Sequence, residues 1–164
     1  MTETKFDPIP EIGSSASASS TGEPKKVLSV FEQFAQVDEQ AEEEGTWTSM
    51  IGEGMRLKIR SFTSTTVQQV QTRTLNALRD KMDSEGNLNA EGALELSSRV
   101  VAQGMVAGWE GPAFVDEKGE ELKWSPEACY HLAKRSKTFR MAVYAYSMND
   151  ENYKAKTKED AVKN

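Results

Sequence analysis

The residues best suited to chemistry in this chain are Cys129 and His131, its single cysteine and single histidine. A thiol nucleophile needs a base that its sulfur can touch, and the local pattern places both residues on one short helix. Residues i and i+2 of an α-helix point about 200° apart, so these two side chains cannot meet. The pair therefore predicts no Cys/His catalytic site, and His131 is interpreted as a surface residue.

Metal and phosphate sites are also disfavoured. A structural zinc ion takes four ligands, mostly Cys and His, and the chain has two such residues. The acidic run 116–121 lacks the alternating oxygen positions and the closing glutamate of an EF-hand calcium loop. The turn 52–54 does not precede a helix and lacks the P-loop lysine. We therefore expect no catalytic, metal or cofactor site, and predict that the protein is not an enzyme.

Composition restricts the partners. The 164 residues suffice for one hydrophobic core, and a hydrophobic content of 37% is low for a chain that is packed throughout. The formal charge of −6 disfavours nucleic acid and anionic membrane as main partners. No segment approaches the ~18 apolar residues of a membrane span. A single cysteine excludes an internal disulfide and fits a reducing compartment. We expect a soluble, cytosolic protein with no nucleic-acid and no membrane partner.

Three parts follow from the local composition. Residues 1–26 contain three prolines and a Ser/Ala run, which predict a disordered N-terminal arm. Residues 27–150 form a single mainly helical domain with a β-hairpin at about 46–60. Residues 151–164 are rich in Lys, Glu and Asp and are interpreted as a charged, flexible C-terminal tail.

The predicted fold class is mainly α (α+β): a small bundle of four or five helices, one β-hairpin and a short extended acidic connection. Apolar residues at helical spacing predict helices over about 30–43, 63–82 and 89–106, one after Pro126, and one over about 138–148. Thr63 is the predicted N-cap of the second helix and Asn89 that of the third.

The hairpin is indicated by a period of two, in which Met55, Leu57 and Ile59 alternate with Arg56, Lys58 and Arg60. The three cations could contact nucleic acid. The pattern places no aromatic residue on this basic face, and the protein is acidic, so that reading is disfavoured.

The extended connection joins two helices and carries a tryptophan near each end. Asp116 and Gly119 predict a tight turn, with Asp116 accepting backbone amides and Gly119 adopting a positive φ. Ser125 and Pro126 then predict a helix start, as N-cap and first helical residue. We expect Trp109 and Trp124 to be at least half buried where the connection meets the helices.

Taken together, these signals resemble the tail assembly chaperones of bacteriophages with long non-contractile tails. The resemblance covers roughly 45–153. Its residues are Trp47, Gly54, Leu57, Ile59 and Arg60 of the hairpin, then 105–111, the turn 116–119, 122–127, and Tyr153 after the last helix.

The resemblance implies a non-enzymatic late protein that acts in the host cell cytoplasm and is absent from the mature virion. Such proteins bind the long helical tape-measure protein, keep it soluble and help to recruit tail-tube subunits. Many have a longer form made by ribosomal frameshifting, which binds the tail-tube protein. Self-association is left open. Two alternatives remain: another phage tail or connector structural protein, or a small acidic cytosolic adaptor that docks through the acidic cluster 38–44.

A tape-measure helix would need an apolar groove, and the two longest predicted helices, 63–82 and 89–106, are the expected walls. Their apolar stripes supply the predicted partner-binding surface, made of Val67, Val70, Leu78, Met82, Leu94, Val101 and Met105.

Overall fold

The structure is a computed structural model that describes residues 29–30, 37–49, 54–116 and 118–155. The predicted arm 1–26 lies outside these residues, so its mobility stays a prediction. In chain order the elements are α2 (Glu39–Glu44), β1 (Thr46–Trp47), β2 (Arg56–Ile59), α3 (Thr65–Ala77), η1 (Arg79–Lys81), α4 (Ala90–Arg99), η2 (Val100–Met105), β3 (Val106–Glu110), α5 (Pro126–Arg135), α6 (Lys137–Ser147) and η3 (Asp150–Tyr153).

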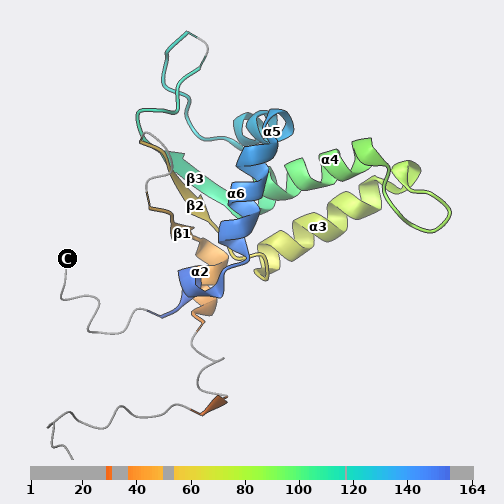
Figure 1. The fold of residues 1–164 in the computed structure, drawn as a ribbon, viewed down its shortest axis with the longest axis horizontal. Coiled ribbons are helices and arrows are strands. Elements are labelled where there is room, and N and C mark those ends of the chain that lie inside the picture. The colour runs from red at the N-terminus through yellow and green to blue at the C-terminus, as the bar shows by residue number, and fades with distance from the viewer. Residues whose placement is uncertain (1–28, 31–36, 50–53, 117, 156–164) are drawn as a thin grey trace, which may run out of the picture.

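Five α-helices and a small antiparallel sheet in this part of the chain confirm the predicted mainly α (α+β) class. α3 and α4 run side by side away from the sheet, and α6 lies across the front of the molecule between them and the strands (Figure 1). The connection between β3 and α5 extends beyond the sheet at the top of this view.

The sheet has three strands in the order β1-β2-β3. The predicted hairpin is confirmed, with Thr46 of β1 opposite Ile59 of β2. β3 was not predicted, because its residues were divided between the end of a helix and the extended connection. It pairs with the other edge of β2, where Trp109 lies opposite Leu57 and both side chains face the core. A third strand gives the hairpin the support that an isolated pair of strands lacks.

The core is built around η2, one turn of π-helix that ends the predicted third helix. Its apolar residues Val100, Val101, Ala102 and Met105 are at most 1% exposed. η2 contacts α3, α4, α5, α6 and β3, so it joins the helical part of the molecule to the sheet. Every residue of η2 except the exposed Gln103 is buried, which explains why this segment is apolar without a clean helical stripe.

Most helix starts agree with the sequence. The side chain of Asn89 accepts the amide of Gly92 at 2.8 Å, and that of Ser125 accepts the amide of Ala128 at 3.1 Å with Pro126 as the first helical residue. The prediction for Thr63 is wrong. Ser64 caps α3 instead, because its extended backbone directs the hydroxyl at the amide of Val67.

The predicted helix 30–43 is also wrong as a continuous element. Val37 pairs with Lys154 in an isolated β-bridge, and the extended Asp38 is the N-cap of the short α2. The side chain of Asp38 accepts two amides of the first turn, so the helix restarts here. Residues 31–36 lie outside the described part of the chain.

The C-terminal boundary lies later than expected. Tyr153 is completely buried, and its hydroxyl donates to the carbonyl of Ile59 at 3.3 Å. Burial raises the pKa of this phenol well above its usual value. The packed chain therefore continues past residue 150 to the bridge between Lys154 and Val37. Within the described residues, no helix combines the length and apolar character needed to cross a membrane.

Candidate functional site

Cys129 and His131 lie on the same helix, but the first is buried and the second is exposed. Cys129 is completely buried, and burial raises the pKa of its thiol to about 12, so the nucleophilic thiolate is suppressed. His131 is exposed on the same helix, with its ring 5.8 Å from that of Tyr130. In the described part of the chain, no group of three or more His, Cys, Asp or Glu side chains could hold a metal ion.

The acidic connection forms the predicted turn. Asp116 accepts the amides of Lys118 at 2.8 Å and Glu120 at 2.9 Å, and Gly119 has a φ of 80°. The carboxylate of Asp116 is thus occupied by backbone amides and holds the loop rather than a ligand.

The two tryptophans of this connection differ. Trp109 is 8% exposed, stacks on Phe114 with ring centroids 4.6 Å apart, and donates its indole N–H to the carbonyl of Leu122 at 2.8 Å. Trp124 is 36% exposed and lies at the surface. Both meet the expectation of being at least half buried, although only Trp109 belongs to the core.

The predicted partner-binding surface is wrong for most of its residues. Val67, Val70, Leu78, Val101 and Met105 are at most 6% exposed. They pack around η2, which fills the space between the two predicted groove walls. Only Leu94 and Met82 are partly exposed. The prediction assumed that part of the apolar stripes of the two helices would stay exposed. The π-helical turn η2, the sheet and α5 cover these stripes instead.

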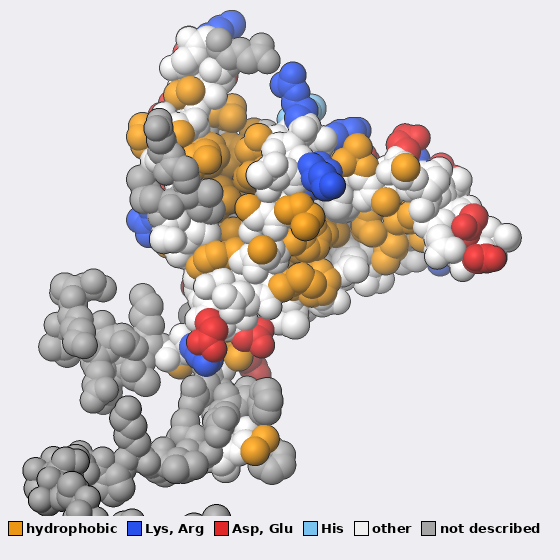
Figure 2. All heavy atoms as spheres, viewed as in Figure 1, with side chains coloured by type: hydrophobic (Ala, Val, Ile, Leu, Met, Phe, Trp, Pro, Cys, Tyr) orange, Lys and Arg blue, Asp and Glu red, His pale blue; other side chains and the backbone are white. Residues whose placement is uncertain are grey.

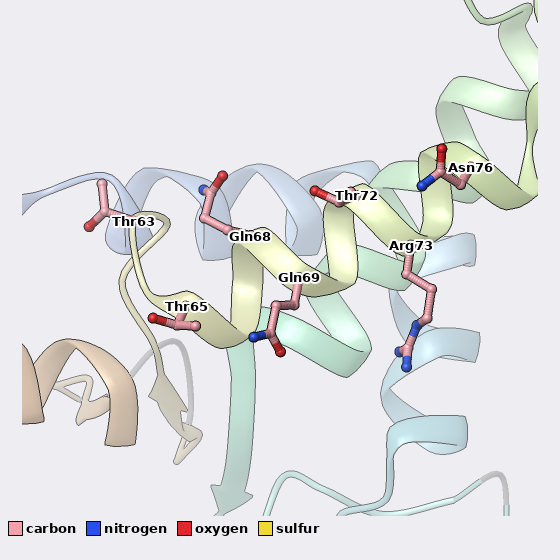
Figure 3. A pocket seen from close by; sticks show the side chains of 7 residues that line it. All are labelled: Thr63, Thr65, Gln68, Gln69, Thr72, Arg73 and Asn76. Carbon is pink, nitrogen blue, oxygen red and sulfur yellow. The ribbon is translucent and has the colours of Figure 1, made fainter.

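The outer face of α3 is polar. A hollow of about 640 Å³ runs along it, and its lining side chains point away from the core (Figure 3). Only Arg73 among them is charged, and it donates to Gln103 at 3.3 Å. This surface offers a partner hydroxyl and amide groups together with the apolar stems of the same side chains. The lining residues are Thr63, Thr65, Gln68, Gln69, Thr72, Arg73 and Asn76.

An apolar hollow of about 280 Å³ lies instead between the sheet, the connection and the corner of α5 and α6. Hydrophobic side chains gather on this part of the surface in Figure 2, between α6 and the strands. Ser136 and Thr138 supply the polar part of its rim. We call it the apolar hollow; it is lined by Met55, Leu57, Phe114, Leu132, Ser136, Thr138, Phe139 and Ala142.

The sequence interpretation missed the apolar hollow, although it contained a signal. Phe114 is a large apolar residue in an otherwise acidic connection, and Phe139 begins the stripe of α6. The contact of both residues with the hollow beside β2 depends on the pairing of β3, which places the connection next to the hairpin and was not predicted from the sequence. Met141 of α6 and its C-cap residue Met148 are each 60% exposed, and neither belongs to the lining of the hollow.

The opposite face of the hairpin carries a mixed cleft of about 760 Å³. The Arg56 guanidinium lies 5.4 Å from the ring centroid of Trp47 and pairs with Glu110 at 2.9 Å. The prediction that the basic face lacks an aromatic residue is therefore wrong, because Trp47 lies opposite Lys58 in the register. We call this the aromatic–basic cleft; it is lined by Asp38, Ala41, Gly45, Thr46, Trp47, Arg56, Lys58, Tyr146, Asn152, Lys154 and Ala155.

The third cation of that stripe has a structural role. Arg60 donates to the carbonyls of Glu43 at 2.8 Å and Gly104 at 3.0 Å, so it joins α2 to the end of η2.

One further carboxylate, that of Glu95 on α4, is held by hydrogen bonds in the helical part. Tyr130 donates to Glu95 at 2.6 Å, and with Arg99 and Lys134 it lowers the pKa of Glu95 to about 2.

Fold and surfaces together define a small, mainly helical α+β protein with an apolar hollow on one side of its sheet and an aromatic–basic cleft on the other. The family model described as YdaY prophage protein matches residues 62–164, more than half of the chain, and the chain belongs to this family. It is therefore a phage-derived protein. No curated protein and no solved structure matches the chain.

Proposed function

We propose that this prophage protein is a tail assembly chaperone, which binds the tape-measure protein, keeps it soluble and helps to recruit tail-tube subunits in the host cell cytoplasm. The observation that carries the proposal is the apolar hollow, which has the methionine Met55 in its lining. The family supports a phage origin, and the tail role rests on the resemblance of residues 45–153.

The hollow suits an amphipathic helix. Its lining is almost wholly apolar, so a Leu, Ile or Phe side chain that projects from a partner helix would lose water without leaving a polar group unpaired. A tape-measure protein exposes long apolar helical stripes before the tail tube encloses them, and such surfaces aggregate. Methionine side chains adapt to several partner shapes, which suits repeated docking along one long helix. Weak contacts at each step would add up along the partner.

The proposal is tested by co-expression of this chain with a tape-measure fragment, followed by pull-down and measurement of the soluble fraction. Ala142→Asp places a charge in the lining of the hollow, on a side chain that is already exposed. Ala93→Asp on α4 is the matched control, because Ala93 is also exposed and lies outside the hollow. We expect at least a tenfold loss of bound fragment with the first variant and none with the second.

Salt separates this mode from a charge-driven one. Screening at 1 M salt acts beyond about 3 Å and removes mainly exposed charge attraction, so binding in the hollow should persist. Loss of binding at 1 M salt, with Ala142→Asp still binding, would assign the contact to the acidic cluster 38–44 and overturn the proposed surface. Absence of binding under all conditions would overturn the chaperone proposal itself.

A further inference from the structure

The aromatic–basic cleft has two aromatic side chains held in fixed positions. Trp47 is 39% exposed, with the Arg56 guanidinium on one side and Gly108 of β3 close to its ring on another. Tyr146 of α6 donates to the carbonyl of Trp47 at 3.3 Å, and its hydroxyl lies 3.1 Å from that of Thr46. The cleft thus presents a preformed aromatic surface between the sheet and the C-terminal part of the chain.

Some of the charged side chains around this surface form ion pairs with described residues, and Lys58 does not. Arg56 pairs with Glu110, and Lys154 pairs with Glu151 at 2.5 Å. Lys58 also lines the cleft, and among the described residues no carboxylate lies within ion-pair distance of it. The acid of the cleft, Asp38, is occupied by the amides of α2. A ligand that carries a carboxylate beside an apolar or proline-rich part would satisfy Lys58.

We propose that the occupant is the N-terminal segment 6–12 of this same chain, Phe-Asp-Pro-Ile-Pro-Glu-Ile, bound in cis in the polyproline II conformation. Aromatic grooves bind proline-rich segments because the polyproline II conformation is already formed and costs little entropy to fix. The segment has prolines at positions 8 and 10, between the acids Asp7 and Glu11. At about 3.1 Å per residue these two carboxylates stand roughly 12 Å apart, one on each side of the prolines.

The sequence offers an internal contrast. The remaining proline of the N-terminal region, Pro24, is followed by Lys25 and Lys26 and would bring cations to a basic cleft. Of the two proline-containing stretches, only segment 6–12 carries acids on both sides. Charge complementarity therefore selects it.

The path of the chain is compatible with this binding. Val37 pairs with Lys154, and Asp38 lines the cleft, so the chain enters the folded body at the edge of this site. Residues 13–36 can span up to about 80 Å when extended, at no more than ~3.3–3.6 Å per residue. Tethering gives a short segment an effective concentration near the millimolar range, so weak contacts suffice.

A nucleic-acid strand fits the cleft less well. Asp38 lines the cleft, Glu110 pairs with its Arg56, and the chain carries a formal charge of −6. A phosphate backbone would meet these carboxylates, with Lys58 as the cation of the lining that has no carboxylate partner among the described residues. A peptide brings two carboxylates to chosen positions instead of a continuous negative chain.

The test uses the full chain with the photo-crosslinking residue p-benzoylphenylalanine at position 9, and mass spectrometry of the irradiated protein. We expect the crosslinks to fall on peptides that contain residues 46–49 and 152–155. The same label at position 17, in the Ser/Ala run, is the control. Trp47→Ala combined with Lys58→Glu should lower the yield at least fivefold, and so should Pro8→Ser combined with Pro10→Ser. Circular dichroism melting checks that each variant stays folded.

Three results would overturn the proposal. Crosslinks spread over the surface, or concentrated in the apolar hollow, would show that segment 6–12 does not bind in the cleft. Crosslinks that join chains of different mass, in an equal mixture of ¹⁴N- and ¹⁵N-labelled protein, would assign the site to a second copy. Binding of a single-stranded oligonucleotide that Trp47→Ala abolishes would assign it to nucleic acid. None of these readouts involves the tape-measure protein, so the chaperone proposal is tested separately.

Discussion

The two faces of strand β2 show how one short segment serves two different surfaces. Leu57 and Ile59 are at most 3% exposed and face the core, and Met55 lines the apolar hollow. Arg56 and Lys58 face the other way, toward the exposed ring of Trp47. Alternation along the strand sends each side chain to its face.

The difference lies in what each face can exchange with a partner. The hollow side offers apolar area that gains by losing water, and its binding should depend little on salt. The cleft side offers the exposed indole of Trp47 and the ammonium group of Lys58, which pairs with no carboxylate of the described residues, and these should give weaker, salt-sensitive and geometry-dependent contacts. Two surfaces of opposite chemistry thus lie on the two sides of one small sheet.

The largest expected effect is the difference in stability between two tryptophan variants, Trp109→Ala and Trp47→Ala. Trp109→Ala removes a buried ring, its stacking on Phe114 and its hydrogen bond to Leu122, and should lower the free energy of unfolding by about 3–5 kcal/mol. Trp47→Ala should cost less than about 1 kcal/mol, because its ring is partly exposed. Urea denaturation of both variants measures the difference. Equal losses would show that Trp47 is also a core residue.

Much of the fold was predictable because its signals are local. The alternation of β2, the cap Asn89, and the start at Ser125 and Pro126 each involve residues within a few positions of one another. Strand β3 and the Val37–Lys154 bridge were not, since each depends on a partner distant in sequence. The sequence from Val106 to Glu110 carries no strong alternation that would distinguish a strand from a connection.

The candidate surface was predicted less well than the fold. Val67 and Met105 were assigned to a partner because apolar stripes on two helices cannot reveal how much the rest of the chain covers. The apolar hollow takes side chains from β2, the connection, α5 and α6, so no single stretch contains it. Trp47 reaches the basic face through the register of a two-residue strand, which sequence spacing leaves undetermined.

A second prediction concerns the joint between β3 and the hairpin tip. Gly111 has a φ of 125°, and a Cβ there would lie 1.8 Å from the carbonyl oxygen of Gly54. Gly111→Ala should therefore cost about 2 kcal/mol or more, from strain and from separation of the two strands that form both surfaces. Gly119→Ala is the control: its φ is 80° with no atom within 4 Å of the added Cβ, so only about 1 kcal/mol of strain applies. A larger loss at Gly119 would contradict this account.

A third prediction uses pH in the helical part, away from both surfaces. The pKa of Glu95 is lowered from 4.5 to about 2, chiefly by the hydrogen bond from Tyr130 and also by Arg99 and Lys134. Because the folded-state pKa is the lower one, its stabilisation is complete above about pH 5 and is lost as pH falls toward 2. Glu95→Gln should lose stability at pH 7 and show a shallower decline from pH 5 to pH 2. Parallel curves for wild type and variant would show that other carboxylates dominate.

The smallest expected effect concerns Lys58, the neighbour of buried Leu57. Leu57→Ala should cost about 2–5 kcal/mol, since it empties a site at the base of the apolar hollow. Lys58→Ala should change the free energy of unfolding by less than about 0.5 kcal/mol, because the side chain is partly exposed and its charge pairs with no carboxylate of the described residues. Thermal melts at low and high salt measure both. A loss above about 1 kcal/mol for Lys58→Ala that salt removes would contradict this account, because it would require a strong ion pair of the ammonium group within the chain, whereas the proposed docking of segment 6–12 needs only weak contacts. A near-zero change at both salt concentrations would show that contacts of Lys58 do not contribute to folding. The free energy of unfolding would then depend on the core-facing side of β2 and not on its cleft-facing side.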